Sequence, residues 1–154
     1  MSIYNTPLEE RFGEKLEELR EGKNMTREQL ADQVGLTARH IAALERGERR
    51  PTLNTMEKLL RTQFPDLASK YVRQFALLFL DLQKKCDSAE ISTKALDLRG
   101  MLDALRLIRR GIPAGAALDM GITNKAFDSY EQGLIRDVIA ARIPAKLDAA
   151  KLFG

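Results

Sequence analysis

Two short helical segments separated by a glycine constrain the fold of this chain more than any other feature of its sequence. Residues 26–46 read TREQLADQVGLTARHIAALER. Thr26 with Gln29 three residues later is a capping box that starts one helix, and Gly35 ends that helix. Thr37 then caps a second helix. The spacing predicts two short helices joined by a tight turn of roughly three to four residues.

The rest of the chain is also predicted to be helical. Apolar residues recur at helical spacing, the alternation typical of strands is missing, and β-branched residues are sparse. A break at Phe64-Pro65-Asp66 separates a predicted domain of residues 1–65 from one of residues 66–154. The predicted helices cover residues 7–21, 26–34, 37–46, 52–62, 67–85, 92–110, 113–121 and 128–143, and a last short one starts at residue 144.

The helix pair at residues 26–46 has the seam that two crossing helices need. Ala31 is small where the helices should touch, and Gly35 permits the turn. The residues predicted to face inward along this seam are Leu30, Val34, Leu36, Ile41 and Leu44. Two short helices with this turn and these inward-facing residues are typical of a helix-turn-helix.

The stretch MTREQLADQVGLTARHIAALERGERRPTLNTMEKL resembles the Cro and phage-repressor (XRE-like) family of DNA-binding domains, and the resemblance covers residues 8–65. It implies an all-α chain with a five-helix-type repressor helix-turn-helix domain, followed by a small helical bundle. It also implies a sequence-specific regulator that binds double-stranded DNA, acting as a repressor and as a homodimer on a palindromic operator.

The resemblance implies that residues 37–46 are the recognition helix, lying in the major groove of DNA. Arg39 has the planar fork that can bind guanine O6 and N7 together, whereas short alanines allow close approach. Glu45 is expected to pair with Arg20 in the first helix and to support the recognition helix. The predicted DNA-binding residues are Arg27, Thr37, Ala38, Arg39, His40, Ala43, Arg46, Arg49 and Arg50. For Arg49 and Arg50, contact with phosphate and simple exposure to solvent are both open.

Charge is segregated along the chain although its formal net value is only +3. Residues 1–22 carry six acidic and three basic side chains, whereas residues 23–65 carry eight basic and five acidic ones. Such a basic segment is typical of a polyanion partner. The single cysteine, Cys86, excludes an internal disulfide, and no signal peptide or membrane-length apolar run occurs. We therefore expect a cytoplasmic protein, of bacterial or phage type, with no membrane partner.

Residues 66–154 contain no pattern typical of a catalytic or metal site. Asp97 and Asp103 stand on one predicted helix with Arg99 and Arg106, and we interpret them as a solvated face. We therefore expect no enzyme activity, no cofactor and no metal. The apolar helix predicted at residues 67–82 is wide enough to serve as core, as a dimer interface, or as both.

The stretch ISTKALDLRGMLDALRLIRRGIPAGAALDMGITNKAFDSYEQGLIRDVIAARI resembles the C-terminal helical lid of MoxR-type AAA+ ATPases over residues 91–143. Lys94 stands where that family has a nucleotide-sensing arginine, and the sequence has no catalytic half of an ATPase. The resemblance implies a helical fold and a contact with another protein. An alternative function is therefore an adaptor or antitoxin-like protein whose C-terminal domain docks on an ATPase or toxin.

Overall fold

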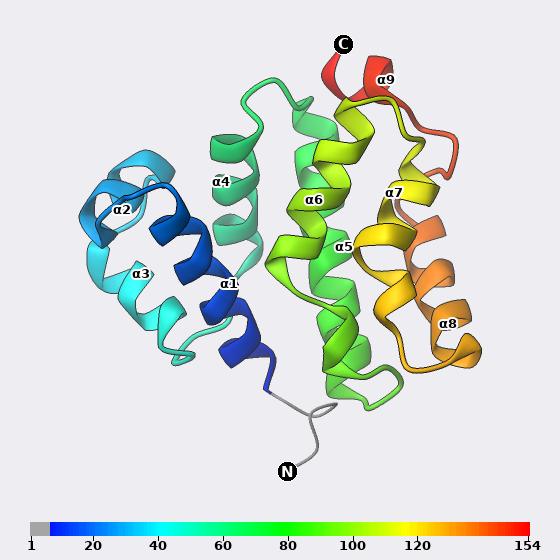
Figure 1. Ribbon diagram of the computed structural model, residues 1–154, viewed down its shortest axis with the longest axis horizontal. Coiled ribbons are helices and arrows are strands. Elements are labelled where there is room, and N and C mark those ends of the chain that lie inside the picture. Colours follow the sequence, from blue (N-terminus) through cyan, green and yellow to red (C-terminus); the bar gives the residue numbers. More distant parts are fainter. Residues whose placement is uncertain (1–6) are drawn as a thin grey trace.

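The computed structural model describes residues 7–154, and every regular element among them is helical (Figure 1). The α-helices are α1 (Leu8–Gly22), α2 (Arg27–Val34), α3 (Ala38–Glu45), α4 (Leu53–Gln63), α5 (Ser69–Asp87), α6 (Leu98–Arg109), α7 (Ala114–Gly121), α8 (Ser129–Ala140) and α9 (Ala149–Phe153). Two short 3-10 helices, η2 (Thr93–Ala95) and η3 (Thr123–Lys125), lie between them. The predicted all-α fold with an N-terminal helix-turn-helix is confirmed.

Side-chain caps start α2, α3 and α4. Thr26 Oγ1 accepts a hydrogen bond from Gln29 N at 3.1 Å, and Gln29 Oε1 accepts one from Thr26 N at 2.8 Å. Thr37 and Thr52 cap α3 and α4 in the same way, each accepting from the backbone three residues on. Because these bonds are local, the starts of α2, α3 and α4 follow the sequence prediction closely.

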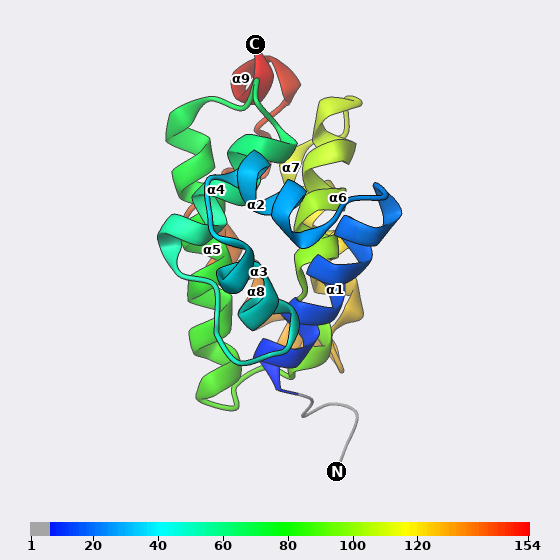
Figure 2. The ribbon, with the colours of Figure 1, turned by 90° about the vertical axis from the view of Figure 1, so that its left-hand side faces the viewer.

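The helices stand side by side and follow one another along the long axis of the molecule (Figure 1). Helices α2 and α3 lie at one end, α7 and α8 lie at the other, and α4, α5 and α6 stand between them. Turned by a quarter, the molecule presents α1 to α4 to the viewer, with α3 near the centre and α6 toward one edge (Figure 2). The described helix-turn-helix therefore caps one end of the molecule.

One hydrophobic core runs through both predicted domains. The buried residues form a single cluster that reaches from Leu8 in α1 to Leu152 in α9. Phe12 of α1 and Phe79 of α5 meet edge to face across the boundary, with ring centroids 6.0 Å apart. Helices α1 and α4 thus pack directly on the C-terminal helices through buried apolar surface, and they carry the helix-turn-helix.

Residues 64–68, at the predicted boundary, contact the C-terminal helix α9. Ala68 N donates to Leu152 O at 2.8 Å, and the Phe64 and Phe153 rings are 6.1 Å apart. The Arg109 guanidinium lies over both rings, 5.0 Å from the Phe64 centroid and 4.7 Å from the Phe153 centroid. Contacts on both sides therefore order this short connection.

Three predicted helix limits in the C-terminal part were wrong. The helix expected from residue 92 starts only at Leu98, after η2, because the Asp97 carboxylate caps it by accepting from Gly100 N at 2.7 Å. The helix expected to reach residue 143 ends at Ala140. The last helix starts after Asp148, whose side chain caps it, rather than at residue 144. The Asp97 and Asp148 side chains set the starts of α6 and α9 by accepting from the backbone three residues on.

Candidate nucleic-acid interface

The turn between α2 and α3 is held by its glycine and by buried apolar side chains. Gly35 has a φ of +74°, in the left-handed region that favours glycine at the end of a helix. Ala31 of α2 is buried, as are Ile41 and Leu44 on the inner face of α3. The inner face of α3 is therefore fixed, and its opposite face is left to solvent.

A close backbone contact with α1 sets the position of α3. A Cβ atom at Gly13 would lie 2.4 Å from Leu44 O and 2.6 Å from Glu45 O, closer than any real side chain approaches. Gly13 is thus required where α1 crosses the end of α3. Gly13 was not predicted from the sequence, because nothing local marks a glycine inside an amphipathic helix as a crossing point.

The Glu45 carboxylate joins three helices. Its side chain has no exposed surface, and it accepts from Arg20 of α1 through Nε at 2.7 Å and Nη2 at 3.0 Å. Arg27 of α2 donates to the same carboxylate through Nε at 2.9 Å. The structure therefore brings together Arg20 and Glu45, as the resemblance implied, and adds Arg27 to the pair.

The charges of this cluster favour its ionised form. Burial raises the pKa of Glu45, but the hydrogen bonds from Arg20 and Arg27 outweigh it and hold that pKa below the ordinary value. The pKa of Arg20 is raised, first by its hydrogen bond to Glu45. Arg27 was expected to contact phosphate, yet here its Nε serves Glu45, and the side chain remains 35% exposed.

The outward face of α3 is made of one long side chain among short ones. Arg39 is exposed and has no ion pair among residues 7–154. Ala38, Ala42 and Ala43 surround it on the helix and are only half-buried. Because the alanines are short, the α3 backbone can approach a groove closely while Arg39 extends beyond it.

A groove of about 630 Å³ runs beside this face, between the starts of α2 and α3. It is lined by Thr26, Arg27 and Glu28 at the start of α2, by Ala38, Arg39 and Ala42 of α3, and by Arg20 of α1. Ala42 was missed by the sequence analysis, although its spacing of three residues from Arg39 could have placed it there.

His40 lies on the flank of α3 that faces α4. Its Nε2 atom is buried without a hydrogen-bond partner among the described residues. Burial, and then the charges of Arg49 and Lys58, lower the pKa of His40, so the ring is neutral at pH 7. The conformation seen here does not present Nε2 to a DNA base, unlike the free face at Arg39.

The basic residues after α3 divide into two kinds. Arg46 and Arg49 are exposed, Arg46 to 62%, with only a loose 4.0 Å pair from Arg46 to Glu48. Arg50, predicted to contact DNA with them, instead grips Asp87 of α5 through two hydrogen bonds of 2.7 Å and also pairs with Glu9 of α1. The guanidinium of Arg50 thus binds two carboxylates in this conformation, and its contact with DNA stays a prediction.

The exposed α3 N-terminus completes the site. Thr37 Oγ1 accepts from His40 N at 3.0 Å, so the first turn of α3 is capped while Thr37 itself stays exposed. The backbone N–H groups of such a turn attract anions. Among the described residues no cluster of side chains could hold a metal ion, and no helix is long and apolar enough to cross a membrane.

Comparison with known proteins supports this reading of the N-terminal part. A helix-turn-helix family model matches residues 16–62, which span the second half of α1, all of α2 and α3, and α4 except its last residue. This segment is therefore a helix-turn-helix domain of the kind found in DNA-binding regulators. Neither the curated proteins nor the solved structures gave a match. Nothing in the comparisons supports the resemblance of residues 91–143 to an ATPase lid.

Proposed function

We propose that this protein is a sequence-specific DNA-binding regulator that inserts α3 into the major groove. The observation that carries the proposal is the free outer face of α3, where Arg39 projects from a bed of alanines. A rigid support behind that face adds to the argument, because Glu45 and Gly13 fix α3 against α1 and α2. Binding would need no chemical step.

Direct reading of bases would rest on Arg39. Its guanidinium can donate two parallel hydrogen bonds to guanine O6 and N7, which discriminates by about 1–3 kcal/mol against other bases. Ala43 and Ala42 beside it are suited to contact with a thymine methyl group. The expected half-site therefore contains one strongly selected guanine next to weakly selected positions.

Phosphate contacts would come from the exposed cations around α3. Arg46 and Arg49 have no strong partner among the described residues, and Arg27 keeps part of its guanidinium exposed. Each phosphate that such a side chain neutralises adds about 0.9 to the slope of log affinity against log salt. We therefore expect affinity for DNA to fall steeply with salt.

We further propose that the regulator acts as a homodimer on a palindromic operator and represses by occupying it. A single helix-turn-helix reads few base pairs, and a symmetric pair doubles the contacts. The helix considered as a possible interface, α5, turns its apolar stripe inward: Val72, Phe75, Phe79 and Leu82 are all buried. The dimer contact of residues 66–154 is therefore assigned to a surface other than that stripe.

Selection of bound sequences from random DNA, at two salt concentrations, tests the proposal, with light scattering to measure mass. A palindromic consensus whose half-sites lie about one helical turn apart, together with a dimer mass, is expected. An enriched single half-site with a monomer mass would contradict the homodimer but not DNA reading. No enrichment would contradict sequence-specific binding itself.

A matched pair of variants tests the assigned reader. Arg39→Ala should lower affinity for the selected site by about tenfold or more while leaving nonspecific binding nearly unchanged. Arg136→Ala is the control, because Arg136 is an exposed arginine of α8, at the opposite end from α3 (Figure 1). Equal behaviour of the two variants would show that α3 does not read bases through Arg39.

One observation favours a second function, docking on another protein. The large exposed apolar side chains of the described residues are Met120, Phe127 and Tyr130, of which Tyr130 is 75% exposed. They lie on α7, at the start of α8, and between the two, far from α3 (Figure 1). A dimer formed through this end would place its two α3 helices at opposite poles, so the patch suits an adaptor contact better than a palindrome reader. Loss of a copurifying partner on Phe127→Ser and Tyr130→Ser, with DNA binding intact, would support it.

A further inference from the structure

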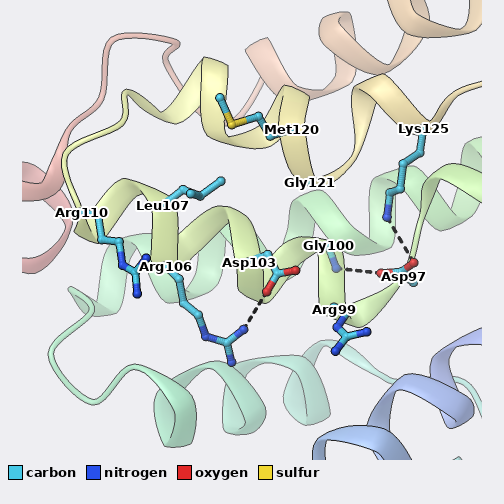
Figure 3. A pocket seen from close by; sticks show the side chains of 10 residues that line it. All are labelled: Asp97, Arg99, Gly100, Asp103, Arg106, Leu107, Arg110, Met120, Gly121 and Lys125. Carbon is cyan, nitrogen blue, oxygen red and sulfur yellow. Dashed lines mark hydrogen bonds and ion pairs between the residues drawn. The ribbon is translucent and has the colours of Figure 1, made fainter.

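The face of α6 that looks away from the core lines a cleft against α7, and we propose that this cleft binds a small dianionic organic molecule. The cleft has a volume of about 530 Å³, within the range of small-molecule sites (Figure 3). Its cationic side chains are Arg99 and Arg106 of α6, Arg110 directly after α6, and Lys125 of η3. Arg106 and Arg110 follow Arg99 by seven and eleven residues, a helical spacing that places the three on one face.

Two glycines form the floor of the cleft. A Cβ atom at Gly100 would lie 2.2 Å from Gly121 O, and one at Gly121 would lie 2.3 Å from Gly100 O. Helices α6 and α7 thus touch through their backbones at this point and diverge from it. Leu107 of α6 and Met120 of α7 line the part of the cleft away from Lys125 (Figure 3). Met120 is 54% exposed, so apolar surface is open to a ligand.

The two carboxylates in the cleft already have partners. Asp97, whose predicted place on a solvated face was wrong because it is buried, caps α6 through Gly100 N at 2.7 Å. It also pairs with Lys125 at 3.2 Å and with Arg11 of α1 at 3.4 Å. Asp103 accepts from Arg106 at 2.9 Å. Neither carboxylate is left to attract a cation.

The remaining charge favours a dianion. Four cationic and two anionic side chains line the cleft, which leaves two positive charges uncompensated within it. Arg110 has no side-chain partner among residues 7–154, and Arg99 has only an exposed 3.6 Å pair with Glu18. A phosphate monoester near pH 7 carries about −1.5 to −2. Guanidinium groups bind such oxyanions through paired N–H donors.

The position of the cleft favours a small molecule over a DNA backbone. Helices α6 and α7 face the viewer in Figure 1, whereas α3 lies at the left end. In Figure 2 the α3 end faces the viewer and α6 and α7 lie toward the right-hand edge. DNA held on α3 therefore lies against a different side of the protein. The exposed Met120 wall also suits an organic group, which a phosphate backbone would not fill.

Titration calorimetry of the full chain without DNA tests the proposal, with phenyl phosphate and phthalate as dianionic probes. Inorganic phosphate, benzoate and benzyl alcohol are the comparison ligands. We expect a dianionic aromatic probe to bind, and each comparison ligand to bind at least fivefold more weakly, because it lacks the organic group or part of the charge (about 1 kcal/mol). The tighter of phenyl phosphate and phthalate identifies a phosphate or a dicarboxylate as the natural group.

Variants locate the binding. Arg110→Gln should weaken the tighter probe about tenfold, since a charged hydrogen bond is lost. Arg73→Gln, at an exposed arginine of α5 outside the cleft, should leave it unchanged. Arg39→Ala should also leave it unchanged, so this proposal and the proposed DNA reading stand or fall separately. Arg110 is exposed and has no side-chain partner among the described residues. The melting temperature of Arg110→Gln should therefore match that of the parent.

Three results would overturn the proposal. The first is no measurable heat with either dianionic probe. The second is equal binding by Arg110→Gln, or equal weakening by Arg73→Gln, because either places the ligand elsewhere. The third is displacement of the probe by a duplex oligonucleotide from the parent and from Arg39→Ala alike, which would assign the cleft to DNA.

Discussion

Replacing Glu45 by glutamine removes one charge from the point where α1, α2 and α3 meet. The variant keeps the size of the side chain and one carbonyl acceptor, so packing changes little. It leaves Arg20, whose side chain is only 13% exposed, and Arg27 without their common counter-charge. The carboxylate itself is fully enclosed, so solvent cannot compensate the loss.

The magnitude follows from the burial of the three groups. Breaking a fully buried ion pair by removing one partner costs about 3–5 kcal/mol. Arg27 is 35% exposed, and the new amide still accepts one hydrogen bond, so we expect about 2 kcal/mol of lost stability. For a chain of this length, that loss lowers the melting temperature by roughly 4–8 °C.

Urea unfolding followed by circular dichroism, between neutral and acid pH, measures this loss. The folded-state pKa of Glu45 lies below its ordinary 4.5, so its stabilising contribution is present above that value. The contribution disappears as the pH falls through the folded-state pKa. The difference between the parent and Glu45→Gln should therefore be constant near neutrality and shrink below about pH 4.5.

Glu48→Gln is the matched control, because Glu48 is 53% exposed and its ion pair with Arg46 is loose, at 4.0 Å. Its stability should lie within about 0.5 kcal/mol of the parent. Equal midpoints for Glu45→Gln and the parent at pH 7 would refute the reasoning. A difference that persisted unchanged into acid would also refute it, since the lost term would then not be the carboxylate charge.

Two further predictions concern the support of α3 and the basic loop that follows it. Gly13→Ala should lower the melting temperature by several degrees and weaken DNA binding, because the new Cβ would collide with Leu44 O. Thermal melts measure the first effect and fluorescence anisotropy the second. An unchanged affinity for DNA would contradict the argument that Gly13 sets the position of α3. Arg49→Ala should reduce the salt slope of DNA binding by about 0.9, whereas Arg50→Ala should leave the slope unchanged, because Arg50 is held by Asp87. Equal slopes for the two variants in a salt titration would mean that Arg50 leaves its carboxylates to bind phosphate.

The starts of α2, α3 and α4 were predicted most closely from the sequence. Thr26, Thr37 and Thr52 each accept a hydrogen bond from the backbone three residues on, so the signal and the bond lie within one helical turn. Gly35 ends α2 for an equally local reason. The confirmed fold class and helix-turn-helix follow from these short-range rules together with apolar periodicity.

The site was predictable only in part. Which residues of a helix are exposed follows from its periodicity, whereas which distant residues form ion pairs does not. The periodicity of α3 is enough to place Arg39 opposite Ile41. It carries no signal that Arg50 would meet Asp87, a residue 37 positions later. The same limit hid the crossing of Gly13 and α3, which depends on the path of a helix far from it in the chain.

The sequence by itself determined that the chain is helical, where most helices of the N-terminal part begin, and that a capped helix pair carries a cationic outer face. The tertiary structure alone decided which cations are free and which are bound. Arg39 and Arg49 remain open, while Arg20, Arg27 and Arg50 are tied to carboxylates on other helices. It also decided that Asp97 is a buried cap and that α6 and α7 enclose a basic cleft. The physical reason is range: caps and periodicity act within a few residues, whereas ion pairs and clefts form only where distant segments pack together.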